Sequence, residues 1–323
     1  MGSYFGQALS AFNVRADLDL NVMRPGQSLT RLTARLLVKL ENHFNHHCPD
    51  LVLAHGDTTT CFAAALSSFY KQIPFYHVEA GLRSHKLNSP YPEEFNRQSV
   101  TPMARHHFAP TELEKENLIK DGISPHLITI TGSTVHDAIH LIKNRNKNET
   151  GLGTQRSLVV VTLHRREANL SITQTLAGIR ATAESRPEVV FVCPMHPNPS
   201  VQKAFKELLG NQKNIVLTNP LPYPEFISLL MKAQLVVTDS GGVQEEAAYF
   251  GKNVLVARGE TERRDGFSSG LVKLIGVTAE STQRFITETL DESNLKKPDN
   301  QTIHDQSPSA SSIIADVVER NVG

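Results

Sequence analysis

The residues that could catalyse a reaction or bind a ligand directly follow short apolar runs in this sequence. Five such runs lead directly into ionisable or glycine-rich residues, and they occupy positions 51–54, 75–78, 159–163, 191–195 and 235–238. Ligands of open parallel sheets bind just outside the carboxyl ends of the strands. Each of these five stretches, taken alone, could equally be a helix cap or a turn. The five together favour a shared ligand site.

Carboxylates in the first half of the chain are candidates for acid/base chemistry. They are Asp57, Glu79 and the adjacent pair Glu93 and Glu94, which follows a Pro-Tyr-Pro segment at the expected start of a helix. Removing a proton from carbon requires a carboxylate held in a semi-buried cleft. The pair also has a structural interpretation, because the helix dipole stabilises carboxylates in a first turn.

The second half of the chain carries residue types that bind an anion. Residues 239–242 (Asp-Ser-Gly-Gly) follow an apolar run and precede an expected helix, so their backbone can approach a phosphate at the helix N-terminus. Gln244, Glu245 and Glu246, further along that helix, are available to accept hydrogen bonds from ribose hydroxyls. Arg258, Arg263 and Arg264 suit a diphosphate. A serine N-cap and an ordinary charged loop are the structural alternatives.

The elements that must position these residues alternate between strands and helices. Expected strands cover 51–54, 74–78, 107–109, 127–130, 158–162, 189–193, 215–218, 235–238 and 254–257. The polar stretch 144–156 is interpreted as a linker. Such alternation predicts an α/β protein with parallel sheets covered on both faces. We therefore expect two domains, 1–150 and 151–306, with a cleft between them, followed by a final helix within 307–323.

Composition narrows the class of protein. Basic and acidic residues balance at 33 each, which gives no general electrostatic attraction to nucleic acid or to an acidic membrane surface. No apolar run approaches the roughly 20 residues that span a bilayer. Three widely spaced cysteines do not make a disulfide framework, so we expect a cytoplasmic protein. We expect no metal at the cluster formed by His43, His46, His47 and Cys48, which lacks a second half-site.

Seven stretches of the chain, in order, resemble the non-hydrolysing UDP-N-acetylglucosamine 2-epimerases. They are 55–60, 77–83, 92–94, 109–111, 164–167, 196–199 and 238–246. The resemblance implies a glycosyltransferase-B-like fold of two Rossmann-like domains, with the final helix packing back on the first. It implies reversible C2 epimerisation of UDP-GlcNAc and UDP-ManNAc through anti elimination of UDP and a 2-acetamidoglucal intermediate. It also implies a homodimer and no metal or nicotinamide cofactor.

The resemblance also assigns roles by position. The implied catalytic residues are Asp57, Glu79, Glu93 and His164, of which the last would help UDP to depart. The implied substrate-binding residues are Phe226 near the uracil, Glu246 at the ribose, and Ser240, Gly241, Gly242 and Arg263 at the phosphates. A second, regulatory UDP-GlcNAc site would include Glu94, Arg165 and His196.

The sequence departs from the family pattern at three places. Family members begin with a strand, a Gly-Thr-Arg-Pro-Glu turn and a helix, so we expect the first βαβ unit of the first domain to be missing. Arg264 stands where the family has proline, and residues 304–308 replace a glycine-rich segment. Two alternatives stay open: a catalytically impaired UDP-sugar-binding protein, and a hydrolysing 2-epimerase that releases ManNAc and UDP.

Overall fold

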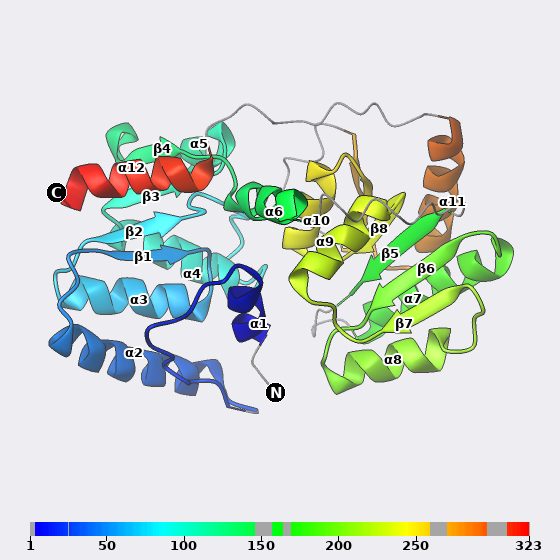
Figure 1. Ribbon diagram of the computed structural model, residues 1–323, viewed down its shortest axis with the longest axis horizontal. Coiled ribbons are helices and arrows are strands. Elements are labelled where there is room, and N and C mark those ends of the chain that lie inside the picture. Colours follow the sequence, from blue (N-terminus) through cyan, green and yellow to red (C-terminus); the bar gives the residue numbers. More distant parts are fainter. Residues whose placement is uncertain are drawn as a thin grey trace. The chain divides into compact units, whose positions relative to one another are not determined.

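The computed structural model describes residues 4–24, 26–145, 157–163, 169–258, 270–295 and 309–322. The chain divides into two compact units, one formed by Ala16–Asp137 with Ser307–Gly323 and the other by Met1–Arg15 with Ala138–Gln306. Each unit is built on its own parallel sheet (Figure 1). We call the first the four-stranded unit and the second the six-stranded unit.

The four-stranded unit has its strands in sequential order. The sheet runs β1 (Val52–His55), β2 (Phe75–Val78), β3 (His106–Ala109) and β4 (Ile128–Ile130), with every pair parallel. The connecting elements are α3 (Thr59–Tyr70), α4 (Glu93–Val100), η1 (Thr101–Met103), α5 (Glu112–Lys120) and η2 (Pro125–Leu127). Since each crossover returns the chain to the same end of the sheet, the carboxyl ends of all four strands share one edge.

Helices cover both faces of this sheet. On one face, α3 contributes Cys61, Ala64 and Ala65 to a core with Phe75 and Val100, and α2 (Leu29–His46) packs on α3. The final helix, α12 (Ala310–Val322), joins a different cluster through Ile314 and Val317, which pack with Tyr76, Val78 and Phe108.

A carboxylate ties the start of α12 to the four-stranded unit. Asp137, in α6 (Thr134–Arg145), accepts hydrogen bonds from the Ser311 backbone N–H at 2.7 Å and from the hydroxyls of Ser311 and Ser309 at 2.6 and 2.9 Å. Such an acceptor is suited to a helix start, where backbone N–H groups lack intrahelical partners. The C-terminal helix is thus held both by apolar packing and by its first turn.

The six-stranded unit is doubly wound around its first strand. The sheet order is β10 (Val272–Leu274), β9 (Asn253–Val256), β8 (Leu235–Thr238), β5 (Leu158–Thr162), β6 (Val190–Pro194) and β7 (Ile215–Thr218). The chain leaves β5 toward β6 and β7 on one side and later returns to β8 on the other. The strand order therefore reverses between β5 and β8, which is where open α/β sheets bind ligands.

Among the described residues, six helices lie wholly within the six-stranded unit, which also includes the larger part of α6. They are α1 (Tyr4–Ala11), α7 (Asn169–Ser185), α8 (Pro199–Leu209), α9 (Tyr223–Lys232), α10 (Gly241–Tyr249) and α11 (Ala279–Leu295). The core beneath them includes the fully buried Leu176, Phe191 and Phe205. α1 packs on α9, and the ring of Phe12, just after α1, lies 6.2 Å from that of Tyr223.

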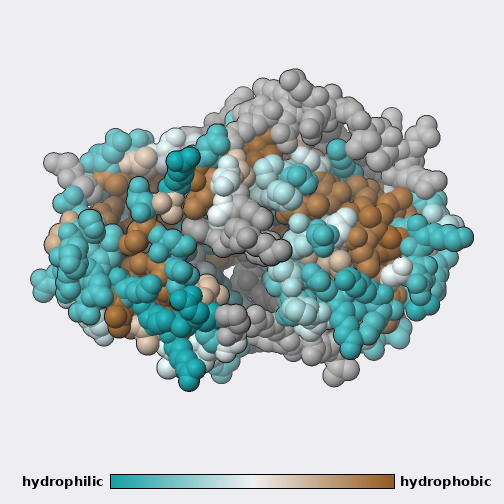
Figure 2. All heavy atoms as spheres, turned by 60° about the horizontal axis from the view of Figure 1, so that its bottom comes forward, coloured by the Kyte–Doolittle hydropathy of each residue, from teal (hydrophilic) through white to brown (hydrophobic). Residues whose placement is uncertain are grey.

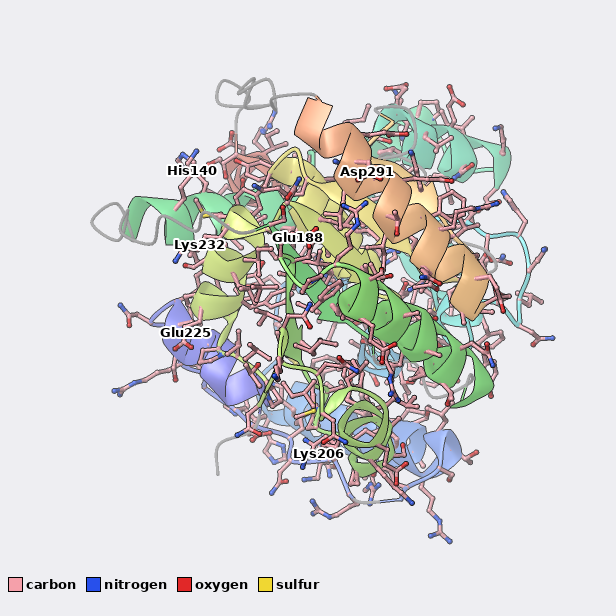
Figure 3. All side chains as sticks on the ribbon, turned by 90° about the vertical axis from the view of Figure 1, so that its right-hand side faces the viewer. His140, Glu188, Lys206, Glu225, Lys232 and Asp291 are labelled. Atoms are coloured by element: carbon pink, nitrogen blue, oxygen red, sulfur yellow. The ribbon has the colours of Figure 1, made fainter. Side chains whose placement is uncertain are left out.

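α7 and α11 approach each other closely in the six-stranded unit. A Cβ placed on Gly178 would lie only 2.4 Å from the carbonyl oxygen of Ala279, so glycine permits the contact. Arg186, just after α7, pairs with Asp291 on α11 at 2.5 Å and with Glu188 at 3.6 Å. Figure 3 labels Glu188 and Asp291.

The surface mixes hydrophilic and hydrophobic side chains. Exposed large hydrophobic residues include Val38 on α2 and Phe69 and Tyr70 at the end of α3. Figure 2 shows brown hydrophobic residues among teal hydrophilic ones on the face it draws. In the described part of the chain, no helix combines the length and apolar character needed to cross a membrane.

The α/β class with two parallel sheets is confirmed, and each predicted strand is present within one residue at its ends. The structure adds β10 and α1, which the sequence analysis did not predict. β10 is a three-residue strand with Lys273 at its centre, so it lacks the short apolar run by which the other strands were predicted. Of the predicted linker, residues 146–156 lie outside the described part of the chain.

Two histidines are buried side by side in the four-stranded sheet. His77 on β2 and His107 on β3 are register partners, and they are 1% and 0% exposed. His77 Nε2 donates to the carbonyl oxygen of Gly56 at 2.7 Å. Neither ring nitrogen of His107 has a hydrogen-bond partner among the described residues. Burial lowers the pKa of His77 to about 4 and that of His107 to about 3.

We expect the four-stranded unit to lose stability as the pH falls from about 6.5 toward 4. The unfolded chain protonates both histidines below their ordinary pKa of 6.5, whereas the folded state keeps them neutral. The two neutral histidines therefore make their full contribution to the free energy of unfolding above pH 6.5. Below that pH, the free energy of unfolding falls by about 1.4 kcal/mol per pH unit for each histidine. Urea unfolding at a series of pH values measures the slope. His107→Leu should reduce it, while His47→Leu, at an exposed position, should not; equal slopes would contradict this assignment.

We expect Gly178→Ala to lower the unfolding midpoint of the six-stranded unit. The added Cβ would push α11 away from α7, and overpacking of this kind costs about 1–3 kcal/mol. Gln174→Ala, at an exposed position of α7, is the matched control and should stay within about 0.5 kcal/mol of the wild type. Thermal and urea unfolding measure both; an unchanged midpoint for Gly178→Ala would show that the two helices can separate without cost.

Candidate active site

Two of the predicted catalytic carboxylates follow neighbouring strands of the four-stranded sheet. β1 ends at His55 and leads through Gly56 to Asp57, and β2 ends at Val78 and leads to Glu79. His55 and Val78 are register partners, and the Gly56 N–H donates to the Val78 carbonyl oxygen at 2.9 Å. Parallel pairing thus places both carboxylates at the same edge of the sheet.

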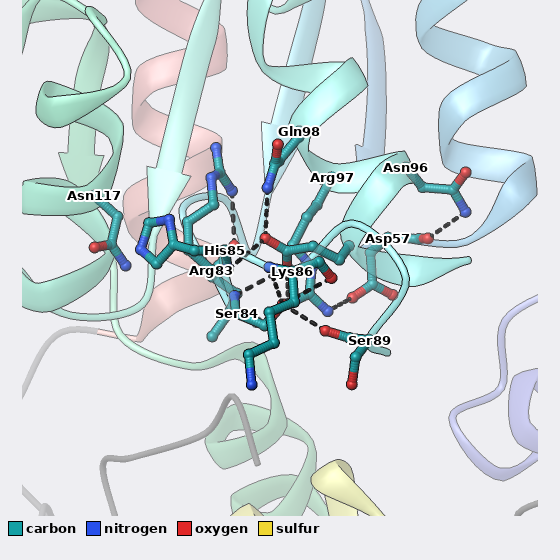
Figure 4. Close-up of polar contacts among 12 residues, drawn as sticks. Asp57, Arg83, Ser84, His85, Lys86, Ser89, Asn96, Arg97, Gln98 and Asn117 are labelled. Atoms are coloured by element: carbon teal, nitrogen blue, oxygen red, sulfur yellow. Dashed lines mark hydrogen bonds and ion pairs between the residues drawn. The ribbon is translucent and has the colours of Figure 1, made fainter. Parts of the chain in front are cut away.

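Asp57 is held by two residues of α4. Arg97 forms an ion pair with Asp57 through its Nη2 and the aspartate Oδ2 (Figure 4). Asn96 Nδ2 donates to the backbone carbonyl of Asp57 at 2.8 Å. The side chain of Asp57 stays 24% exposed, so it is anchored and still accessible.

Glu79 adopts an unusual backbone conformation. Its φ of +60° lies in the left-handed region, which residues other than glycine rarely occupy and which is concentrated at functional sites. Its Oε2 is 3.7 Å from His55 Nδ1, and His55 Nε2 hydrogen-bonds Thr134 Oγ1 at 3.2 Å. A Cβ added to Gly56 would lie 3.3 Å from the same Oε2, so the carboxylate rests against this glycine.

Glu93 and Glu94 begin α4 but differ in their surroundings. Glu93 is half-buried, whereas the side chain of Glu94 is 0% exposed. The Glu94 oxygens accept from the backbone N–H groups of Ser84 and His85, both at 3.0 Å, from Gln98 at 2.7 Å and from Arg97 at 3.2 Å. Burial raises the pKa of Glu94, but the hydrogen bonds and the Arg97 charge outweigh it and leave the pKa below its ordinary value.

In the six-stranded unit, the predicted phosphate-binding residues lie at the switch point of the sheet. Thr162 at the end of β5 and Thr238 at the end of β8 are register partners whose hydroxyls are 2.8 Å apart. Ser240, the N-cap of α10, donates its backbone N–H to Thr238 Oγ1 at 3.0 Å, and its side chain makes no capping bond. Apart from its own helix and chain neighbours, no described residue has an atom within 4 Å of a Cβ built on Gly242, so the glycine leaves room at the helix start.

Phe226 and Glu246 lie on helices that pack together. Phe226 is half-buried on α9, and Glu246 is buried on α10. Tyr223, at the start of α9, hydrogen-bonds Glu246, and burial followed by the Glu246 charge raises the pKa of the Tyr223 phenol. The carboxylate that we expect at the ribose is therefore oriented by a tyrosine three residues before the aromatic ring that we expect at the uracil.

The remaining predicted residues divide into two groups. His164, Arg165 and Arg263 lie outside the described part of the chain. His196 follows β6 at the carboxyl edge of the six-stranded sheet, and its Nδ1 accepts from the Asn198 backbone N–H at 3.2 Å. Among the described residues, no group of three or more His, Cys, Asp or Glu side chains is placed to hold a metal ion.

The sequence analysis missed the residues that hold the carboxylates. Asn96 and Arg97 follow Glu93 at spacings of three and four, which place them near it on one helix face. That spacing was readable, but their partner Asp57 is about 40 residues away. Arg258, assigned above to a diphosphate, is buried and donates from Nε to the carbonyl of Asp239 at 2.6 Å.

Comparison with known proteins supports the family resemblance over almost the whole chain. The family model described as UDP-N-acetylglucosamine 2-epimerase matches residues 1–319. UDP-N-acetylglucosamine 2-epimerases from Campylobacter jejuni and Escherichia coli K12 are 40% and 39% identical to it. These alignments cover 88% and 89% of this chain and 79% and 80% of the relatives.

Solved structures agree with the sequence relatives. A Neisseria meningitidis UDP-GlcNAc 2-epimerase bound to UDP-GlcNAc is 36% identical with a TM-score of 0.91, covering 98% of this chain and 89% of that one. A Methanocaldococcus jannaschii UDP-GlcNAc 2-epimerase in complex with UDP-GlcNAc and UDP is 28% identical with a TM-score of 0.81, covering 96% and 87%. The resemblance inferred from seven sequence stretches is thereby confirmed. The chain belongs to the UDP-N-acetylglucosamine 2-epimerase family of isomerases and has their glycosyltransferase-B-like fold.

Proposed function

We propose that this protein interconverts UDP-GlcNAc and UDP-ManNAc by epimerisation at C2 of the sugar. The observation that carries the proposal is the pair of anchored carboxylates, Asp57 and Glu79, at one edge of a parallel sheet in a member of this family. The Neisseria and Methanocaldococcus relatives, which bind UDP-GlcNAc, support the substrate class.

The chemistry requires a base, a leaving group and an acid. In the proposed reaction a carboxylate takes the C2 proton, and the C2–H electrons form a C1=C2 double bond as UDP leaves C1 with the C–O electron pair. The products are 2-acetamidoglucal and UDP. Return of UDP to C1, with delivery of a proton to the opposite face of C2, gives the epimer. Asp57, Glu79 and Glu93 are the proposed proton donors and acceptors, because both faces of C2 need such a group.

The six-stranded unit supplies the proposed UDP site. Ser240, Gly241 and Gly242 would receive the diphosphate at the start of α10, where backbone N–H groups and the helix dipole favour an anion. Glu246 would accept from the ribose hydroxyls, and Phe226 would lie against the uracil. Arg263 at the phosphates and His164 at the departing UDP complete the proposal.

Three further expectations stay predictions. They are a regulatory UDP-GlcNAc site that includes Glu94, Arg165 and His196, assembly as a homodimer, and a cytoplasmic location. The last is in keeping with Cys48, Cys61 and Cys193, which are free thiols in the structure.

Incubation of the purified protein with UDP-GlcNAc in deuterated water tests the proposed reaction. We expect UDP-ManNAc to form and deuterium to appear at C2 of both UDP-sugars, because the abstracted proton exchanges with solvent before it returns. Asp57→Asn should slow label uptake by at least about 100-fold, a typical effect of losing an acid/base group. Mass spectrometry and proton NMR measure both.

Other outcomes of this experiment would identify a different activity. Release of free ManNAc and UDP would indicate a hydrolysing 2-epimerase. UDP-GlcNAc binding without label uptake by the wild-type chain would indicate a UDP-sugar-binding protein without turnover. Either result would overturn the proposed epimerisation.

We expect Gly56→Ala to reduce kcat at least tenfold. The new Cβ would meet the Glu79 Oε2 at 3.3 Å and displace the carboxylate, and the φ of +77° adds backbone strain of about 1–2 kcal/mol. Gly122→Ala is a matched control, because its φ is +89° and, chain neighbours apart, no described residue has an atom within 4 Å of the added Cβ. Both variants should lose similar stability, but only Gly56→Ala should lose turnover. Equal kcat values for the two variants would contradict this role of Gly56.

A further inference from the structure

A buried arginine joins two carboxylates of the four-stranded unit. Arg97 is 3% exposed, and its guanidinium contacts Asp57 through Nη2 and Glu94 through Nη1, the latter at 3.2 Å. Figure 4 shows Arg97 and Asp57 close to Ser84 and Ser89. Asp57 is an expected acid/base residue, whereas Glu94 is fully enclosed by its own chain.

Glu94 fixes the direction in which Arg97 points. Three donors besides Arg97 occupy the Glu94 oxygens: the backbone N–H groups of Ser84 and His85, and Gln98 Nε2. A carboxylate with this many hydrogen-bond partners is held in one orientation. The Arg97 guanidinium that contacts it is therefore held in one orientation as well. Arg97 therefore reaches Asp57 from a rigid base.

Helix α4 controls both the backbone and the side chain of Asp57. Asn96 donates to the Asp57 carbonyl at 2.8 Å, while Arg97, one residue later, engages Oδ2. The same helix begins with Glu93, a second expected acid/base residue. The relative placement of Asp57 and Glu93 thus depends on one short helix, and Arg97 is its charged contact with Asp57.

We propose that Arg97 is a positioning residue for proton transfer at C2. It holds the Asp57 carboxylate by Oδ2 and so directs the second oxygen, Oδ1, with which Asp57 would exchange the proton. Glu94 serves this task indirectly, by holding Arg97. The inference rests on the proposed epimerisation, in which Asp57 acts on the sugar.

Arginine suits this task for a geometric reason. Its planar guanidinium presents donors in a fixed fork, so one group can contact two carboxylates in defined directions. Lysine keeps the charge but has no fork, and methionine keeps similar bulk without charge. The series Arg97→Lys and Arg97→Met therefore separates geometry from charge.

The test measures deuterium uptake at C2 of UDP-GlcNAc and the affinity for UDP. We expect Arg97→Met to lower kcat about 100-fold, the scale on which a misplacement of about 1 Å slows catalysis. KM and the Kd of UDP should stay within about threefold, because the proposed UDP residues lie in the other unit. Arg97→Lys should recover at least about tenfold of the lost kcat, since it restores a cation beside Asp57.

The chain offers a matched control for the loss of a buried arginine. Arg83, in the same unit, is 7% exposed and contacts Asp121, Thr101 and the carbonyl of Leu82, each at 2.7–2.8 Å. Arg83→Met should also lower the unfolding midpoint, because it leaves the Asp121 carboxylate without its cation, as Arg97→Met does for Asp57 and Glu94. Its kcat should stay within about threefold of the wild type.

Several results would overturn the proposal. Wild-type kcat in Arg97→Met, or equal losses of kcat in Arg97→Met and Arg83→Met, would leave Arg97 with a structural role only. If Arg97→Met does not fold, the double variant Glu94→Gln with Arg97→Met removes both buried charges. A wild-type kcat in that variant, or a loss of kcat equal to that of Arg83→Met, would likewise overturn the proposal. A wild-type protein that takes up no deuterium would overturn the epimerisation itself, and this inference with it.

Discussion

Parallel pairing of strands is the constraint on which the site depends. A parallel neighbour can be reached only by a crossover, so each connection brings the chain back to the same end of the sheet. In the four-stranded unit this places Asp57, two residues after β1, and Glu79, one residue after β2, at the same edge of the sheet. In the six-stranded unit it places Ser240 beside the end of β5, where the strand order reverses. The proposed site residues thus lie at one edge of each sheet.

Burial of charged groups also restricts how the side chains near the first of these edges can be arranged. Glu94 and Arg97 are almost fully enclosed, and an enclosed ion persists only when its partners replace the lost hydration. Glu94 has four donors, including the Arg97 guanidinium, and the guanidinium extends the pairing to the partly exposed Asp57. The cost of enclosing the cluster is offset only when its members adopt one arrangement, so the same contacts that keep α4 in place also orient Asp57.

The backbone conformation at Gly56 and Glu79 also fixes the position of the Glu79 carboxylate. Gly56 and Glu79 both have positive φ, at the ends of adjacent strands, and the Glu79 carboxylate rests against the glycine. His55 lies beside that carboxylate and is itself hydrogen-bonded by Thr134, at the start of α6. Strain of this kind persists only where the surrounding contacts over-determine it. Here those contacts come from three separate elements, β1, β2 and α6.

The sequence alone determined the α/β class, the nine strands with a readable pattern, and Asp57 and Glu79 at strand ends, because alternation of apolar runs and their boundaries are local properties. The family was identified by the resemblance of seven sequence stretches. The sequence did not reveal β10, whose three residues include a central lysine and form no apolar run, or the roles of Asn96 and Arg97. Their roles depend on Asp57, which precedes them by about 40 residues and contacts them only in the folded unit. Glu94 shows the same division: its place in a first turn was readable, but its complete enclosure by Ser84, His85, Gln98 and Arg97 was not. Only tertiary structure decides such contacts, since burial and long-range charge pairing arise when separate segments pack together.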